Sequence, residues 1–185
     1  TGRAAEEFHG DWYAGLGFNQ ERGFPLEGGL VYAAPGLYSG RLDTFYLHDG
    51  GSNRREILNN LDNTPIVEED RSMIHTENRV HLGDNTPLDL TLFRLGDPAV
   101  WSEFYQHEYR EAERPESSVY LRHGVENRLL TASGRFNLND FSYASDRTLA
   151  DSFTEELPNV AFNLFSEEIA ALHALLDTAT HKHKK

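Results

Sequence analysis

The chain has no cysteine among its 185 residues. This absence excludes disulfides, thiolate metal sites, iron–sulfur clusters and cysteine nucleophiles. Because small secreted domains usually carry disulfides, we expect a cytoplasmic location, although a secreted one stays open. The first residue is Thr1, and no charged and then apolar leader follows it, so we expect that any targeting segment has been removed.

Positive charge and long apolar runs are also scarce. Lys plus Arg number 17 against 30 Asp plus Glu, which gives a net charge of −13. An acidic surface repels phosphate backbones, so we expect no nucleic-acid partner. No apolar run approaches the roughly 18 residues that a membrane helix needs, so we expect no membrane partner either.

Along much of the chain, hydrophobic and polar residues alternate with a period of two. Turn signals such as Gly28-Gly29, Gly50-Gly51 and Ala34-Pro35-Gly36 recur about every ten to twenty residues, a spacing typical of strands and hairpins. Between the turn signals, alternating and β-branched stretches predict strands at 42–48, 72–82, 88–92, 101–110, 119–123, 128–133 and 136–143.

The stretch 72–82 illustrates the alternation. One face carries apolar and β-branched residues, namely Ile74, Thr76, Val80 and Leu82. The other face carries His75, Glu77, Arg79 and His81, and its charge favours a solvated surface.

Helices are expected only near the ends of the chain. Residues 4–8 can form a short helix, and 54–61 can form a single helical turn. Ser166 followed by two acids is typical of a helix start, and the apolar spacing behind it predicts a C-terminal helix. We expect that helix to dock on the sheet through Ile169, Leu172 and Leu176.

Together these elements predict one all-β domain over residues 1–185. The expected architecture is an antiparallel up-and-down β-barrel of about eight strands, with a short N-terminal helix and a C-terminal helix. A curved sheet packed on the C-terminal helix is the alternative, because a sequence does not show whether a sheet closes.

The stretch Phe8-His9-Gly10-Asp11-Trp12-Tyr13 resembles the first signature of the lipocalin and calycin families, Gly-x-Trp-Tyr at the start of the first strand. The resemblance implies a barrel with Trp12 buried near its closed end. The chain departs from that family in lacking the disulfide cysteines and the Thr-Asp-Tyr motif. In size and acidity it is also similar to small bacterial natural-product cyclases that form spirotetronate and spirotetramate rings.

The stretch 101–110 is the strongest candidate for a ligand site. As a strand it places Trp101, Glu103, Tyr105, His107 and Tyr109 on one face. Aromatic walls with a few polar groups are typical of a small-molecule cavity. In the alternative, this face is external, and Ser102, Phe104 and Gln106 point inward.

We assign roles to these residues on the cavity interpretation. Glu103, Tyr105 and His107 are the catalytic candidates, because burial would keep Glu103 protonated as an acid and His107 can accept or donate a proton. Trp101, Tyr109 and, across the cavity, Tyr46 are the substrate-binding candidates. The pairs Tyr46 with His48 and His75 with Glu77 each share a strand face, and either pair can complete a polar cluster.

Metal and cofactor motifs are missing from the sequence. The closest histidine pair is His181 and His183, and the other histidines lie too far apart for a ligand set, so no metal is expected. Gly15-Leu16-Gly17 lacks the third glycine of a dinucleotide-binding turn, and no phosphate-binding loop is present, so no cofactor is expected.

These observations favour an enzyme that cyclises or isomerises a bulky, largely apolar, polyketide-like molecule inside the barrel without a cofactor. A non-catalytic carrier of a hydrophobic small molecule is the alternative. A partner-binding module that uses its acidic face is a third hypothesis, and the sequence leaves open a homodimer.

Overall fold

A computed structural model describes residues 7–51, 69–97, 99–107, 116–139 and 156–165. It contains eight strands and one short helix in these ranges. The elements are β1 (His9–Leu16), β2 (Leu26–Ala34), β3 (Tyr38–His48), β4 (Asp70–Gly83), β5 (Thr86–Leu95), α1 (Ala99–Phe104), β6 (Ser117–Val125), β7 (Arg128–Phe136) and β8 (Glu156–Leu164).

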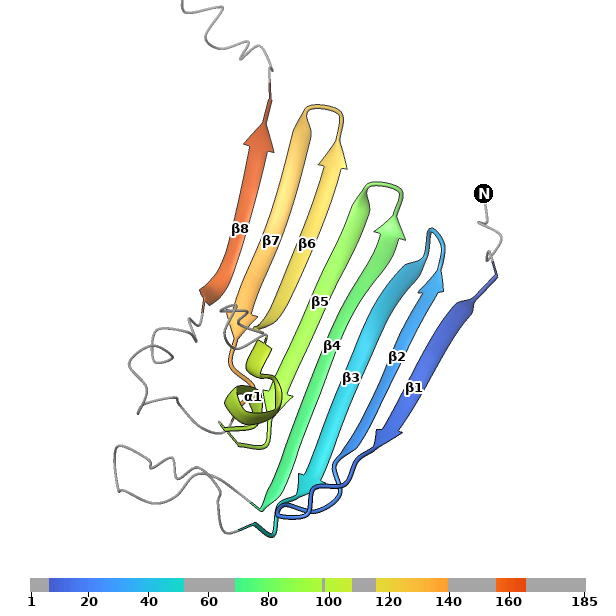
Figure 1. Cartoon of the computed structure of the whole chain (residues 1–185). Coiled ribbons are helices and arrows are strands. Elements are labelled where there is room, and N and C mark those ends of the chain that lie inside the picture. Colours follow the sequence, from blue (N-terminus) through green and yellow to red (C-terminus); the bar gives the residue numbers. More distant parts are fainter. Residues whose placement is uncertain (1–6, 52–68, 98, 108–115, 140–155, 166–185) are drawn as a thin grey trace, which may run out of the picture.

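The strands form one antiparallel sheet in sequence order, from β1 to β8 (Figure 1). Each strand pairs with the next one along the chain, so the prediction of an all-β, up-and-down arrangement of eight strands is confirmed. The sheet is not closed into a barrel: within the described residues, β1 and β8 lie at its opposite edges. The helices expected at 4–8, at 54–61 and after Ser166 lie largely or wholly outside the described residues.

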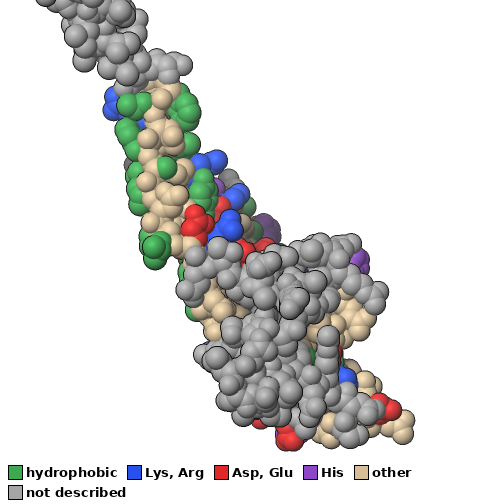
Figure 2. Space-filling model, turned by 90° about the vertical axis from the view of Figure 1, so that its left-hand side faces the viewer, with side chains coloured by type: hydrophobic (Ala, Val, Ile, Leu, Met, Phe, Trp, Pro, Cys, Tyr) green, Lys and Arg blue, Asp and Glu red, His purple; other side chains and the backbone are tan. Residues whose placement is uncertain are grey.

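The two faces of the sheet differ in chemistry. The register places Asp43, His75 and Phe93 side by side on the face that α1 covers, which we call the α1 face. The alternate positions, such as Leu42, Thr76 and Leu92, form the opposite face, which we call the apolar face. Seen from the β8 edge, charged and histidine side chains gather on the right, and hydrophobic side chains run along the left margin (Figure 2).

The buried core lies between α1 and the adjoining ends of β3, β4 and β5. Its members are Phe45, Leu47, Met73, Phe93, Leu95, Val100 and Trp101, with Phe104 and Tyr105 packed against them. Trp101 stacks on Tyr105 with ring centroids 5.1 Å apart and meets Phe93 edge-on at 5.3 Å. The core therefore holds the one described helix against one end of the α1 face.

The strand predicted at 101–110 is wrong, because residues 99–104 form α1. Asp97 explains the helix start, since its carboxylate accepts the backbone N–H of Ala99 at 2.8 Å, as a capping residue does. The spacing from Trp101 to Tyr105 fits one helical turn as well as a strand face, so alternation alone does not separate the two. The stretch 136–143 also differs, because β7 ends at Phe136.

Strands β2 and β8 escaped prediction. Gly28 and Gly29 lie inside β2, where they read as a turn signal. Pro158 lies inside β8, which is tolerated because this strand lies at the edge of the sheet. In both strands a residue that usually breaks a strand is accommodated by its place in the sheet.

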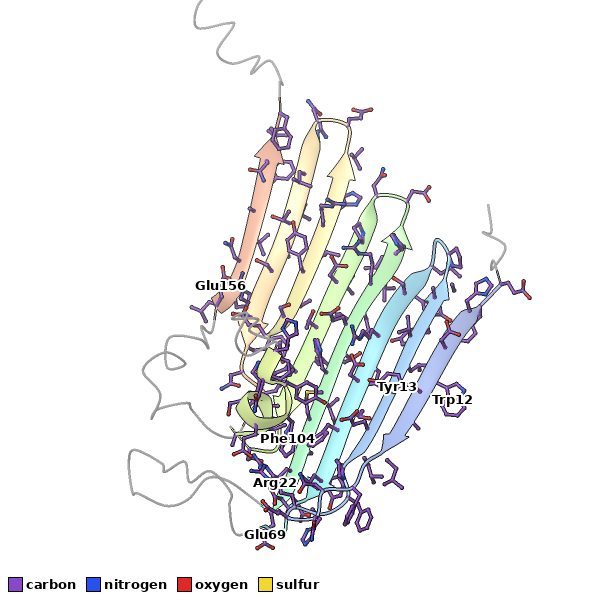
Figure 3. The ribbon with its side chains drawn as sticks, in the orientation of Figure 1. Trp12, Tyr13, Arg22, Glu69, Phe104 and Glu156 are labelled. Carbon is purple, nitrogen blue, oxygen red and sulfur yellow. The ribbon has the colours of Figure 1, made fainter. Side chains whose placement is uncertain are left out.

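The position of Trp12 contradicts the burial expected from the Gly-x-Trp resemblance. Trp12 is 78% exposed and belongs to the apolar face, whereas its neighbour Tyr13 points to the α1 face. Figure 3 shows Trp12 projecting outward from β1 and Tyr13 lying toward the neighbouring strands. Burial of Trp12 would need a layer over the apolar face, and the described residues provide none there.

We predict that the two tryptophans contribute unequally to stability. Trp101→Ala should lower the free energy of unfolding by about 3–5 kcal/mol, the usual cost of deleting a large buried ring. Trp12→Ala should change it by less than about 0.5 kcal/mol in aqueous buffer. Urea unfolding followed by circular dichroism measures both, and equal losses would contradict the assigned core.

Candidate functional site

A fully buried arginine organises the end of the sheet where α1 lies. Arg71 of β4 has a side chain that is 0% exposed. Its guanidinium donates to Asp49 at 3.0 Å, to Asp97 at 3.0 and 3.3 Å, and to Glu103 at 2.7 Å. Because a buried charge is tolerated only with partners, removing one member of such a group typically costs about 3–5 kcal/mol. We call Arg71, Asp49, Asp97 and Glu103 the Arg71 cluster.

The Arg71 cluster joins segments that are distant in the sequence. Asp49 directly follows β3, Asp97 follows β5, and Glu103 lies in α1. Arg22, from the connection between β1 and β2, also donates to Glu103 and lies 3.7 Å from Asp49. The Phe104 ring lies under the Arg71 guanidinium, 4.9 Å away, and Arg22 and Phe104 are close together in Figure 3. These contacts fix α1 over the sheet.

Glu103 is a charged member of this cluster, which corrects the expectation of a protonated acid. Burial by itself raises the pKa of Glu103, but the hydrogen bonds from Arg22 and Arg71 outweigh it and place the pKa below its usual value of 4.5. Glu103 is therefore an anion at neutral pH, and its carboxylate positions α1.

We predict that Glu103 makes stability depend on pH in the acid range. A carboxyl whose pKa is lowered by folding stabilises the protein above the unfolded-state pKa, and this contribution disappears as pH falls through the folded-state pKa. Glu103→Gln should cost less than the loss of a whole partner, about 1–3 kcal/mol at pH 7, because Arg71 keeps Asp49 and Asp97 and an amide oxygen still accepts a hydrogen bond. The cost should fall progressively below about pH 4. Chemical unfolding at a series of pH values measures the difference.

Glu77→Gln is the matched control for this prediction. Glu77 is a 59% exposed carboxylate, 3.4 Å from His75. Its loss should change the free energy of unfolding by less than about 1 kcal/mol, as for surface ion pairs. A Glu103→Gln effect that stays constant from pH 7 to pH 3 would contradict the ionised state of Glu103.

A pocket opens on the α1 face next to this cluster. Its volume is about 310 Å³. Two kinds of wall line it: an aromatic and thioether side from α1, the residue after α1 and β4, and a polar side from β1, β2, β3 and β4. The lining residues are Tyr13, Glu27, Arg41, Asp43, Met73, His75, Glu77, Trp101 and Tyr105.

The polar wall contains a hydrogen-bonded group that joins β1 and β3 across the strand between them. The Tyr13 hydroxyl donates to Asp43 at 2.9 Å, and Arg41 Nε donates to the other carboxylate oxygen of Asp43 at 2.5 Å. Partial burial and the bond to Asp43 both raise the pKa of Tyr13 above its usual value of 10.0. Tyr13 is therefore a neutral hydrogen-bonding group at the pocket.

His75 is the titratable group between the two walls. Its ring meets Phe93 edge-on at 5.6 Å, and its Nε2 lies 3.4 Å from Glu77. Burial lowers the pKa of His75 below 6.5, and the charge of Glu77 only partly opposes this shift. The imidazole is therefore mainly neutral at pH 7 and can accept a proton.

The structure separates the six site residues that the sequence predicted. Trp101 and Tyr105 line the pocket together, while Glu103 belongs to the Arg71 cluster. His107 is exposed, and Tyr109 lies outside the described residues.

Tyr46 is not across the pocket from Trp101. It lies on the apolar face, donates to Asp70 at 2.8 Å and lines a different hollow with His48. The expected sharing of one face by Tyr46 and His48 is nevertheless confirmed, since both side chains contact Asp70.

Sequence reasoning missed Tyr13, Arg41 and Asp43 as pocket residues. Tyr13 and Asp43 are 30 positions apart, and the register of β1, β2 and β3 brings them together. The pair His75 with Glu77 was visible as a local signal, but the solvated surface expected for it holds only for Glu77. His75 is half-buried at the pocket.

In the described part of the chain, no three His, Asp or Glu side chains are placed to hold a metal ion. No described helix is long and apolar enough to cross a membrane. No protein-family model matches the chain, and no curated protein matches it. The eight-stranded meander is consistent with a calycin-like architecture, and neither the lipocalin nor the cyclase resemblance gains support from a relative.

Proposed function

We propose that the protein binds a small planar molecule in the pocket beside α1. One observation carries this proposal: the stacked rings of Trp101 and Tyr105 share a pocket with the hydrogen-bonded group of Tyr13, Asp43 and Arg41. An aromatic wall holds a flat ligand by its face, and convergent polar groups fix its edge. A protein that binds this molecule without transforming it would be the carrier of the alternative hypothesis.

The charge of the pocket narrows the ligand class. The pocket lining contains three carboxylates, from Glu27, Asp43 and Glu77, and one guanidinium, from Arg41. This excess of carboxylates disfavours anions and favours neutral or cationic molecules, which aromatic faces also attract. We therefore propose a planar, neutral or cationic ligand with hydrogen-bond donors on its edge.

We predict that three planar probes bind in a fixed order. Proflavine, a cation, should bind more tightly than neutral 2-naphthol, and 2-naphthol more tightly than the anion 2-naphthoate. Isothermal titration at constant ionic strength measures the three dissociation constants. Tighter binding of 2-naphthoate than of proflavine would contradict the assigned charge.

Variants locate the binding site. Tyr105→Leu should weaken proflavine binding by about three- to tenfold, because one stacked ring is lost. Tyr120→Leu is the matched control, since Tyr120 is a 40% exposed aromatic residue of the α1 face outside the pocket lining. If both variants weakened proflavine binding equally, the pocket would not be the binding site.

Cofactor-independent isomerisation is the second candidate function, and His75 favours it. A neutral imidazole in an aromatic pocket can take a proton from a carbon next to a ketone carbonyl and return it to the γ-carbon. This step moves a carbon–carbon double bond without a change in composition or oxidation state. Cyclisation of an enolisable substrate would begin with the same proton removal.

We predict that an isomerase activity would follow the ionisation of His75. With cyclohex-3-en-1-one as probe, formation of the conjugated ketone should be constant above about pH 6.5 and decline below it, because only neutral His75 accepts a proton. His75→Gln should reduce the rate by about 10²-fold or more while leaving proflavine binding within about threefold. If the protein bound proflavine but did not isomerise cyclohex-3-en-1-one, the result would contradict the isomerase function and favour the carrier function.

A further inference from the structure

Among the described residues, none forms a layer over the apolar face of the sheet. Apolar residues occupy this face in every strand, for example Trp12 in β1, Leu42 in β3, Leu92 in β5 and Phe162 in β8. Trp12 is 78% exposed, Phe162 is 60% exposed and Leu92 is 42% exposed. The polar side chains Thr76 and Asn78 also lie on this face and are hydrogen-bonded to each other. Exposed apolar side chains spread over so wide a face mark contact with another apolar phase or partner.

Charge on this face is confined to the ends of strands. Within the described residues, the Asp, Glu, Lys and Arg positions of the apolar face are Asp70, Arg94 and Arg128. Asp70 begins β4, Arg94 is next to the last residue of β5, and Arg128 begins β7. An uncharged belt therefore crosses the middle of all the strands.

The belt extends to both lateral edges of the sheet. Trp12 of edge strand β1 and Phe162 of edge strand β8 are among its most exposed members. An interface with a second protein has a polar rim all around its apolar centre. The hydrocarbon layer of a bilayer has polar boundaries only on its two surfaces. The sheet matches this pattern, because the described part of its apolar face carries charge at the ends of the strands and none at the lateral edges.

The connections between strands are unequal at the two ends of the sheet. At one end, residues 35–37, 84–85 and 126–127 form tight turns. At the other end, where α1 lies, the connections are 17–25, 49–69, 96–116 and 137–155 (Figure 1). Short turns on one side and long connections on the other are typical of sheets that stand in a bilayer.

We propose that the apolar face contacts the hydrocarbon of a lipid bilayer, with the polar α1 face turned away from the lipid. Strands that cross a bilayer have about 9–11 residues at a tilt of about 45°, and β2, β3, β5, β6, β7 and β8 have nine to eleven residues. In hydrocarbon the outer edges of β1 and β8 need hydrogen-bond partners too, and these edges can pair with each other or with a second copy.

This proposal departs from the expectation of no membrane partner, which was based on the lack of a long apolar run. The absence of a long apolar run tests for helices, whereas a strand shows its apolar residues at every second position. The surface is separate from the pocket, so the proposal does not depend on the proposed function. Because the chain has a net charge of −13, contact should rest on apolar burial without any need for anionic lipid.

The two tryptophans provide the test, because Trp12 lies on the apolar face and Trp101 in the core. The full chain is mixed with dioleoylphosphatidylcholine vesicles, and two single-tryptophan variants are compared, Trp101→Phe and Trp12→Phe. In brominated phosphatidylcholine vesicles, emission from Trp12 should be quenched by half or more, and emission from Trp101 should change little. Trp12 that stays fully accessible to aqueous acrylamide in the presence of vesicles overturns the proposal.

Vesicle flotation with a matched pair of variants provides the second measurement. Leu92→Lys places a charge in the uncharged belt, and Val31→Lys places one on the α1 face, where Val31 is 53% exposed. Leu92→Lys should lower partitioning into vesicles by about 30-fold or more, and Val31→Lys by less than threefold. The proposal is overturned if the chain stays in the aqueous phase and sediments as a dimer that Leu92→Lys disrupts. The apolar face would then be the contact with a second copy of the chain.

Discussion

The buried guanidinium of Arg71 is the constraint on which the organised end of this sheet depends. An arginine keeps its charge when buried, so carboxylates must meet it, and here three of them come from two connections: Asp49 follows β3, and Asp97 and Glu103 lie between β5 and β6. Satisfying Arg71 therefore fixes where the chain turns after β3, where α1 begins and how α1 lies on the sheet. The aromatic wall of the pocket follows from that position, since Trp101 and Tyr105 belong to the same segment.

The alternation of side chains gives the sheet two faces with different surroundings. In a lipocalin-like barrel the apolar side chains would point inward around the ligand. Here α1, the hydrophobic core beneath it, the Arg71 cluster and the pocket occupy the face that carries most of the charges, and the other face carries exposed apolar side chains. This arrangement assigns small-molecule chemistry to the polar face and hydrophobic contact to the apolar face. The two proposals thus concern opposite sides of one sheet.

The candidate site was only partly visible in the sequence. Trp101 and Tyr105 stood out because a period of two places them on one face with polar groups between them, a mixture typical of a small-molecule cavity, and both line the pocket. Glu103 was recognised as special, but its role changed, since two arginines distant in the sequence keep it ionised. Asp43 and Tyr13 gave no signal, because their contact depends on the register of three strands.

The sequence by itself determined the class of fold, most of the strands and the division of β4 into two unlike faces, because these features follow from local alternation and turn residues. It did not decide between helix and strand at residues 99–104, where the Asp97 cap and the burial of Val100 and Trp101 in the core favour the helix. Nor did it decide which groups line the pocket or whether the sheet closes. Those outcomes depend on contacts between residues far apart in the chain, and only the tertiary structure brings such residues together.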